Sequence, residues 1–68
     1  MEITVNGDAV TLDGPLTIAR LLVEQKVKMP DMVSVEHNGK ILDRAEFETQ
    51  QVQSGDTVEF LYFMGGGA

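Results

Sequence analysis

Two Asn-Gly pairs, each between short runs that alternate apolar and polar residues, limit the fold of this 68-residue chain most strongly. A two-residue hairpin turn of type I′ needs positive φ at both central positions, and Asn-Gly meets that need best. The apolar members of the flanking runs are Met1, Ile3, Val5, Val10 and Leu12 around the first pair, and Val33, Val35, Ile41 and Leu42 around the second. Because alternation is typical of half-buried strands, the sequence predicts hairpins at Asn6-Gly7 and Asn38-Gly39.

One longer helix is expected between the hairpins, from Ile18 to Lys26. Thr17 is a suitable N-cap, because its hydroxyl can accept a hydrogen bond from a free backbone N–H. The apolar residues recur at helical spacing, and Val23 widens the stripe that we expect to face the core. Pro30 prevents the helix from continuing.

After the second hairpin, Asp43 to Phe47 is expected to form one helical turn, with Asp43 as its cap and Phe47 folded onto the core. Val52 anchors a polar connection, Gly55-Asp56 forms a turn, and Thr57 to Phe63 has the composition of a strong strand. Strands around one main helix predict an α+β domain with one sheet packed on that helix. The sheet is mixed if its first and last strands pair in parallel. We expect one domain over residues 1–64.

The last strand holds more apolar residues than one covered face needs. Val58, Phe60 and Tyr62 share one face, and if it faces the helix, Leu61 and Phe63 point towards solvent with Met64 just beyond. An exposed apolar patch of this kind marks a docking site. The alternative is that loops cover these residues, as in a strand buried on both faces.

Residues 65–68 form a glycine tail, Gly65-Gly66-Gly67-Ala68. Glycine loses more backbone freedom on folding than any other residue, so we expect a flexible tail that can enter a narrow channel. Extended, four residues reach roughly 13 Å beyond Met64. A frayed terminus without a function is the alternative.

The composition excludes several functions. A net charge of −6 excludes nucleic acid binding through phosphates and suits a partner with a basic surface, although acidic residues also keep small proteins soluble. Without cysteine, and with His37 as the single imidazole, we expect neither a metal site nor catalytic residues. His37 adjoins a hairpin turn and is expected at the surface. No apolar run approaches the length of a membrane span and no signal peptide is evident, so we expect a cytoplasmic protein.

The whole chain resembles the ubiquitin-like sulfur carriers, and most closely the ThiS carriers of thiamine biosynthesis. The resemblance rests on the order and spacing of several segments and on the short length. These segments are Ile3-Thr4-Val5-Asn6-Gly7, Thr17-Ile18-Ala19-Arg20-Leu21-Leu22, Val35-Glu36-His37-Asn38-Gly39-Lys40, Asp43-Arg44 with Phe47, Gly55-Asp56-Thr57-Val58-Glu59-Phe60, and an apolar residue before the final glycines.

The resemblance implies a β-grasp fold and a carrier that is not an enzyme and binds no cofactor. An E1-like adenylating enzyme would use ATP and Mg²⁺ to activate the C-terminal glycine carboxylate. A cysteine desulfurase persulfide would supply sulfur to form a thiocarboxylate, which thiazole synthase would then receive. Gly67 is the expected acceptor, Gly66 and Gly65 the segment that threads into the partners, and Leu61, Phe63 and Met64 the docking residues. We expect a monomer outside these complexes.

The family pattern ends at Gly-Gly, whereas this chain continues to Ala68. Three interpretations are open: a peptidase removes Ala68, the adenylating enzyme accepts a terminal alanine, or this copy carries no sulfur. We favour removal, because the Gly67 carboxyl is held in a peptide bond while Ala68 is attached.

Other functions fit the same pattern. Within the family, the chain could be the small subunit of molybdopterin synthase or a carrier for another sulfur-containing metabolite, although the short length favours the thiamine carrier. Outside it, a non-catalytic ubiquitin-like interaction module or protein tag has the same features. A stand-alone enzyme is disfavoured, because Glu24, Asp31, Glu46 and Glu48 have no spacing that suggests paired carboxylate catalysis.

Overall fold

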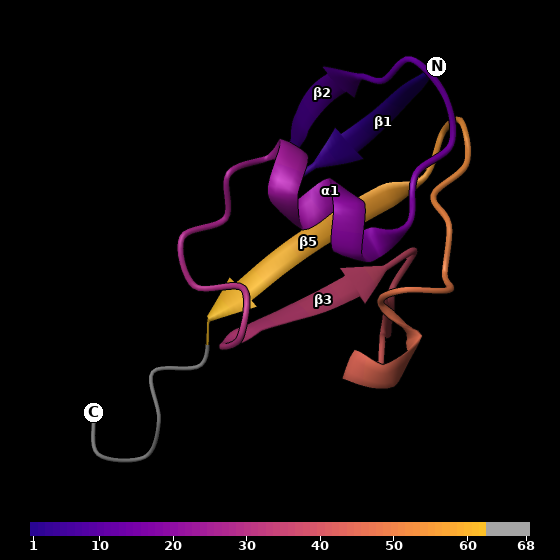
Figure 1. Ribbon diagram of the computed structural model, residues 1–68. Helices are drawn as coiled ribbons and strands as arrows, with labels where there is room; N and C mark the ends of the chain where they lie inside the picture. Colours follow the sequence, from indigo (N-terminus) through magenta and orange to yellow (C-terminus); the bar gives the residue numbers. More distant parts are fainter. Residues whose placement is uncertain (63–68) are drawn as a thin grey trace.

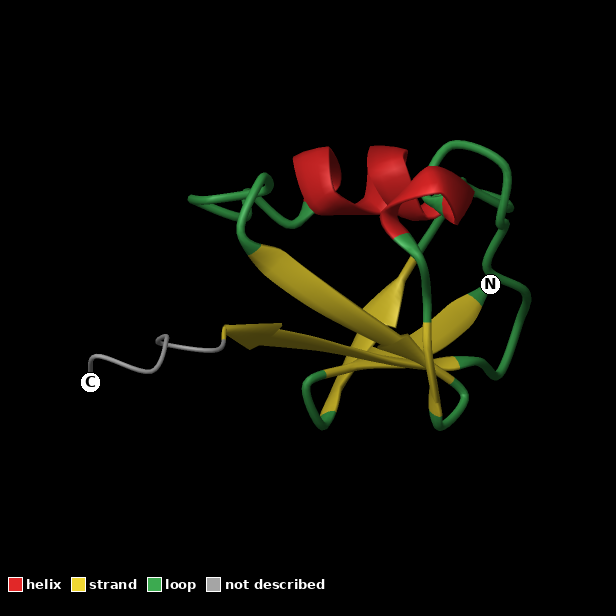
Figure 2. Ribbon diagram, turned by 90° about the horizontal axis from the view of Figure 1, so that it is seen from below, coloured by secondary structure: helices red, strands yellow, loops and turns green. Residues whose placement is uncertain are grey.

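The computed structural model describes residues 1–62, which form one sheet with one α-helix across it. The elements in chain order are β1 (Glu2–Val5), β2 (Asp8–Thr11), α1 (Ile18–Glu24), β3 (Val33–His37), β4 (Lys40–Ile41), the 3₁₀ helix η1 (Arg44–Glu46) and β5 (Thr57–Tyr62). The sheet order is β2-β1-β5-β3-β4, and Figure 1 shows α1 crossing it. Seen edge-on in Figure 2, the helix lies on one side of the sheet. The predicted α+β class, a mixed sheet on one main helix, is confirmed.

Both predicted hairpins are present. β1 pairs antiparallel with β2, and β3 with β4. At the first turn φ is 50° for Asn6 and 87° for Gly7, and at the second 51° for Asn38 and 86° for Gly39. These are the positive φ values that a type I′ turn requires, so the Asn-Gly pairs set the register of both hairpins.

β5 lies in the centre of the sheet, between the two hairpins. It runs parallel to β1, with Val5 beside Val58, and antiparallel to β3, with Val35 beside Phe60. The Asn6 side chain extends the β1 contact beyond the strand, because its Oδ1 accepts a hydrogen bond from the Phe60 N–H at 2.8 Å. The condition for a mixed sheet, parallel pairing of the first and last strands, is therefore met, and this pairing joins segments about 50 residues apart in the sequence.

The start of α1 is held by its cap and by a later loop. As predicted, Thr17 caps the helix, and its Oγ1 accepts from the Arg20 N–H at 3.2 Å. The next free donors bond to carbonyls of the loop after η1: Ile18 N–H to Gln50 O at 2.9 Å, and Ala19 N–H to Phe47 O at 2.8 Å. The first-turn donors, which a helix cannot satisfy internally, therefore attach α1 to the connection that leads to β5.

The helix ends at Glu24, two residues before the predicted end at Lys26. Lys26 has a φ of 57° and its N–H bonds to Val23 O, while the Val27 N–H bonds to Leu22 O at 3.1 Å. These two bonds form a Schellman motif, in which a residue in the left-handed conformation terminates the helix. Glycine usually takes this position, so nothing in the sequence pattern marked Lys26 as the end.

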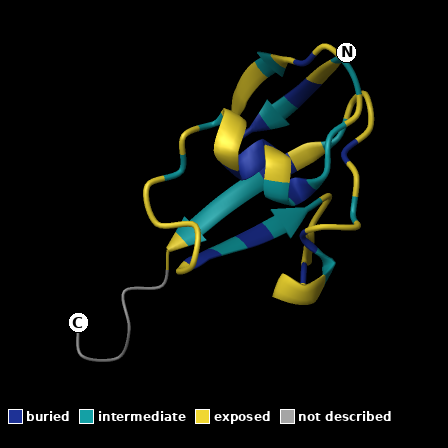
Figure 3. Cartoon of the chain, in the orientation of Figure 1, coloured by how far each residue is buried: buried dark blue, intermediate teal, exposed yellow. Residues whose placement is uncertain are grey.

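The core lies between α1 and the sheet. Figure 3 marks buried positions on β1, β3 and α1. The buried residues of the core are Ile3, Val5, Leu12, Ile18, Leu21, Leu22, Val33, Val35, Leu42, Phe47, Val52 and Val58. Phe47 and Val52 are buried as predicted. Val23 is not: it is 64% exposed, so its expected place in the core stripe is wrong. The short helix buries the side defined by Ile18, Leu21 and Leu22, and Val23 lies off that side.

We predict that Lys26→Gly stabilises the domain by about 0.5–1 kcal/mol, because glycine adopts positive φ without the steric cost that a Cβ brings. Urea denaturation of the wild type and the variant measures the change. Lys28→Gly is the matched control: Lys28 is exposed in the same loop and is not among the described residues with positive φ. The control is expected to lower stability slightly through the entropy of the unfolded chain. A loss of stability in Lys26→Gly equal to that of the control would contradict this reading of the helix end.

Candidate functional site

The end of β5 carries the one predicted docking residue within residues 1–62. Val58 is buried beneath α1, Phe60 is half-buried, and Tyr62 is 41% exposed on the same face. Leu61 lies on the opposite face, beside Ser34 of β3, and is half-buried. The predicted division of the two faces is therefore confirmed for β5. The other predicted site residues (Phe63, Met64, Gly65, Gly66 and Gly67) lie outside the described residues, as does Ala68.

The sheet face that bears Leu61 has no helix over it within residues 1–62 (Figure 2). We call it the open face. Strand alternation and register place ten side chains on it: Glu2, Thr4, Ala9, Thr11, Ser34, Glu36, Ile41, Thr57, Glu59 and Leu61. None of them is fully buried, and Ile41 is 52% exposed. The sequence analysis did not identify Ile41 as an exposed residue of this face. Alternation could have identified it, because Ile41 and Leu42 are neighbours in the chain and cannot share a face of the sheet.

A polar network fixes the start of β5 against the second hairpin. His37 Nε2 lies 2.7 Å from Asp56 Oδ2, and both side chains are nearly buried, at 11% and 14% exposure. The other Asp56 oxygen accepts from Asn38 Nδ2 at 3.1 Å, and Oδ2 also accepts from the Gln53 N–H at 2.8 Å. The Asn38 side-chain oxygen accepts from the Thr57 N–H at 2.8 Å. The network therefore joins the turn before β5 to the end of β3.

The expectation that His37 is a surface residue is wrong. Its backbone is paired with Val58, whose side chain is fully buried in the core, so the His37 ring lies on the helix side of the sheet. Burial acts to raise the pKa of Asp56, but the Gln53 N–H, the hydrogen bonds from His37 and Asn38, and the charge on His37 together lower it.

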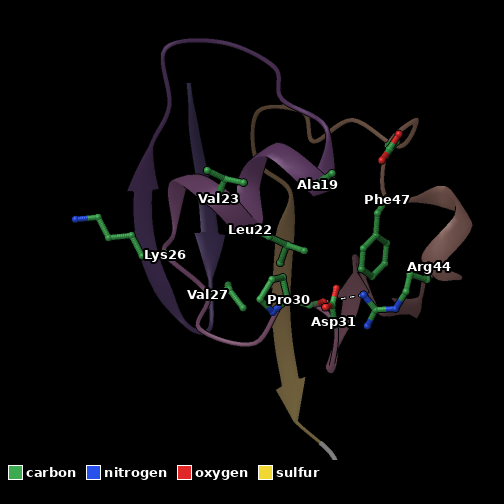
Figure 4. Close-up of a pocket in the computed structure, with 10 residues that line it drawn as sticks. Ala19, Leu22, Val23, Lys26, Val27, Pro30, Asp31, Arg44 and Phe47 are labelled. Carbon is green, nitrogen blue, oxygen red and sulfur yellow. Dashed lines mark hydrogen bonds between the residues drawn. The ribbon is translucent and has the colours of Figure 1, made fainter.

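A groove of about 550 Å³ lies on the helix side, between α1 and η1 (Figure 4). Its apolar wall includes Leu22, Val27 and Phe47, and Arg44 supplies a cation. The Arg44 guanidinium already has partners within the domain. It donates to Pro30 O at 2.7 Å and to Val33 O at 2.6 Å, and it lies 5.1 Å from the centre of the Phe47 ring. Arg44 therefore holds the loop before β3, a role that the sequence did not reveal.

Residues 1–62 hold no group of three or more His, Asp or Glu side chains that could bind a metal ion. Within the same residues, no helix is both long and apolar enough to cross a membrane. The acidic residues Glu24, Asp31 and Glu48 are exposed and Glu46 is half-buried. Glu24 forms an ion pair with Arg20 at 2.9 Å, and Glu46 accepts from the Asp43 N–H at 3.0 Å.

Comparison with known proteins gives consistent results. The model of the ThiS family matches residues 3–67. A crystal structure of the thiamine biosynthesis protein (ThiS) from Geobacter metallireducens superposes with a TM-score of 0.92 at 49% identity, over 98% of this chain and 100% of that one. A solution structure of a thiamine biosynthesis protein from the same organism has a TM-score of 0.78 at 48% identity, over 100% of this chain and 90% of that one.

A longer relative was also found. A thiazole synthase of Paramagnetospirillum magneticum is 31% identical over 68 residues, which is 100% of this chain and 21% of that protein. The chain therefore spans about a fifth of the length of the curated relative that it matches.

We predict that Asp56→Asn destabilises the domain at pH 7 by about 1.5–3 kcal/mol, the range for hydrogen bonds to a charged group. Because the folded-state pKa of Asp56 lies below its usual value of 3.8, the stability it contributes is present above that value. It is lost as the pH falls from there through the folded pKa. Urea denaturation between pH 7 and pH 2 measures both effects.

Asp13→Asn is the control, because Asp13 is exposed and outside the network. It is expected to keep the stability and acid sensitivity of the wild type, whereas Asp56→Asn is expected to flatten the loss of stability below about pH 4. Equal stability of Asp56→Asn and wild type at pH 7 would show that the network does not hold β5.

Proposed function

This chain belongs to the ThiS family of sulfur carriers, and we propose that it carries sulfur for thiamine biosynthesis as a thiocarboxylate on the main-chain carboxyl of Gly67. The observation that carries this proposal is the extent of the family match. It covers the β-grasp domain and continues to Gly67, and Ala68 lies beyond it. The names of the two solved relatives favour the thiamine pathway over molybdopterin synthesis.

The composition leaves one place for the sulfur. The chain has no cysteine, so no side chain can hold a persulfide, and the main-chain terminus is the remaining acceptor. A carboxylate resists nucleophiles until it gains a leaving group. ATP and Mg²⁺, bound by an E1-like adenylating enzyme, would supply that group as AMP, with pyrophosphate released.

The sulfur would come from the persulfide of a cysteine desulfurase. Its terminal sulfur attacks the acyl-adenylate and expels AMP, and a second thiol then cleaves the sulfur–sulfur bond to leave the thiocarboxylate and a disulfide. In this sequence of steps the chain performs no catalysis. It presents its terminus, and Gly65 and Gly66 offer a segment without side chains to the active sites of its partners.

Ala68 must leave before Gly67 can be activated, and we propose that a peptidase removes it. Leu61, together with Phe63 and Met64, is proposed to contact the partners as the terminus enters. The thiazole synthase relative supports that enzyme as the recipient, because about a fifth of its length resembles this chain. The cytoplasmic location expected from the sequence remains a prediction.

The test uses purified adenylating enzyme and desulfurase with cysteine, ATP and Mg²⁺, and intact-mass spectrometry as the readout. A variant that lacks only Ala68 is expected to gain the mass difference of one sulfur for one oxygen, and the full-length chain to remain unchanged. Loading of the full-length chain would overturn the requirement for a peptidase. The absence of loading in both forms, with the desulfurase active, would overturn the proposed function.

Deletion of Gly66 to Ala68 is expected to abolish loading while leaving the melting temperature unchanged, because these residues follow the last strand of the sheet. Circular dichroism measures folding and intact mass measures loading. The matched control is the variant that lacks Ala68 alone. A lower melting temperature in the three-residue deletion would show that the glycines contribute to the folded domain.

A further inference from the structure

Glu36 and Glu59 lie directly opposite each other on the antiparallel strands β3 and β5, on the open face. Directly opposed residues on one face of such a pair have Cβ atoms about 4.5–5.5 Å apart, and like charges at this spacing destabilise a sheet. Both side chains are half-buried, and neither forms a salt bridge within residues 1–62. The register therefore places two like charges on neighbouring strands, and no salt bridge within residues 1–62 offsets them.

The open face has one sign of charge. Its ten strand positions hold three glutamates and neither lysine nor arginine. The five basic residues of the chain lie elsewhere: Arg20, Lys26, Lys28 and Arg44 on α1, the loop after it and η1, and Lys40 at a β4 position paired with His37. A cationic partner surface fits the open face, and an anionic one does not.

Apolar side chains flank the two glutamates. Ile41 is the cross-strand neighbour of Glu36 on β4 and is 52% exposed. Leu61 follows Glu59 by two residues on the same face and is half-buried. A partner that covers Ile41 and Leu61 would exclude water from the carboxylates, and attraction between opposite charges strengthens when water is excluded.

We propose that the open face binds thiazole synthase, and that an arginine of the synthase inserts between Glu36 and Glu59. The planar guanidinium has five N–H donors in a fixed fork, so one side chain can bridge two carboxylates and remove their repulsion. This inference rests on the proposed function. The synthase is chosen because a relative of that name contains a region like this chain within one longer polypeptide.

A contact at the open face would affect sulfur delivery, because β5 forms part of this face and leads towards Gly67. Gly67 lies six residues after Leu61, a distance of at most about 20 Å in an extended chain. Docking at Glu36, Glu59 and Leu61 therefore sets how far the terminus can reach into the synthase.

The experiment measures binding of immobilised thiazole synthase to the wild-type chain and to the double variant Glu36→Gln and Glu59→Gln. The double variant is expected to bind about tenfold more weakly, with an association rate that falls less with added salt. Its melting temperature is expected to rise by about 2 °C, because the repulsion in the free domain is gone. If Glu36 and Glu59 had only a structural role, their substitution would not weaken binding while raising the melting temperature.

The control is the double variant Asp13→Asn and Glu48→Gln, which also removes two negative charges, but from exposed positions away from the open face. It is expected to bind as tightly as the wild type. Equal weakening in the control would reduce the effect to net charge and overturn the proposal, as would unchanged binding in the double variant. Because sulfur loading of the wild type is measured separately, these results would leave the proposed function standing. Failure of the wild type both to load and to bind would overturn the two together.

Discussion

The central position of β5 is the constraint on which the rest of the structure depends. β5 pairs with β1 on one side and β3 on the other, so it joins the two hairpins into one sheet. Its register is fixed at both neighbours by side chains as well as by the strand ladder: Asn6 bonds to the Phe60 N–H, and Asn38 to the Thr57 N–H. Since each asparagine also occupies a hairpin turn, the same two residues shape the hairpins and attach the last strand to them. The strand that leads towards Gly67 is therefore attached to both hairpins by side chains as well as by backbone pairing.

The sequence was sufficient for those features that follow from local chemistry or from simple periodicity. The Asn-Gly turns, the Thr17 cap and the alternation of β5 were all predictable, because each depends on a residue's own conformational preference or on the two-residue repeat of a strand. The end of α1 was not, because Lys26 adopts a conformation that its type disfavours and that the Schellman bonds impose. The burial of His37 was also missed, since its partner Asp56 is distant in sequence and only the β3–β5 register brings the two together.

The candidate site likewise has residues whose positions were predictable from the sequence and residues whose positions were not. Leu61 was placed correctly because its face follows from alternation along β5. The opposition of Glu36 and Glu59 depends on the register between two strands that a 19-residue connection separates, and no sequence pattern gives that register. Ile41 was predictable in part. Alternation assigns it to the face opposite Leu42, but its position beside Glu36 follows only from the pairing of β4 with β3.

The two faces of the sheet place different demands on the same strands. On the helix side, β5 needs apolar residues: Val58 belongs to the buried core, and Phe60 packs against that core. On the open face nothing within residues 1–62 selects for packing, so residue choice there is free to serve solubility or recognition. Solubility alone would be served by any arrangement of acidic residues, including one that keeps them apart. The direct opposition of two glutamates lowers the stability of the free domain without improving solubility over a staggered arrangement, and this favours recognition as its cause.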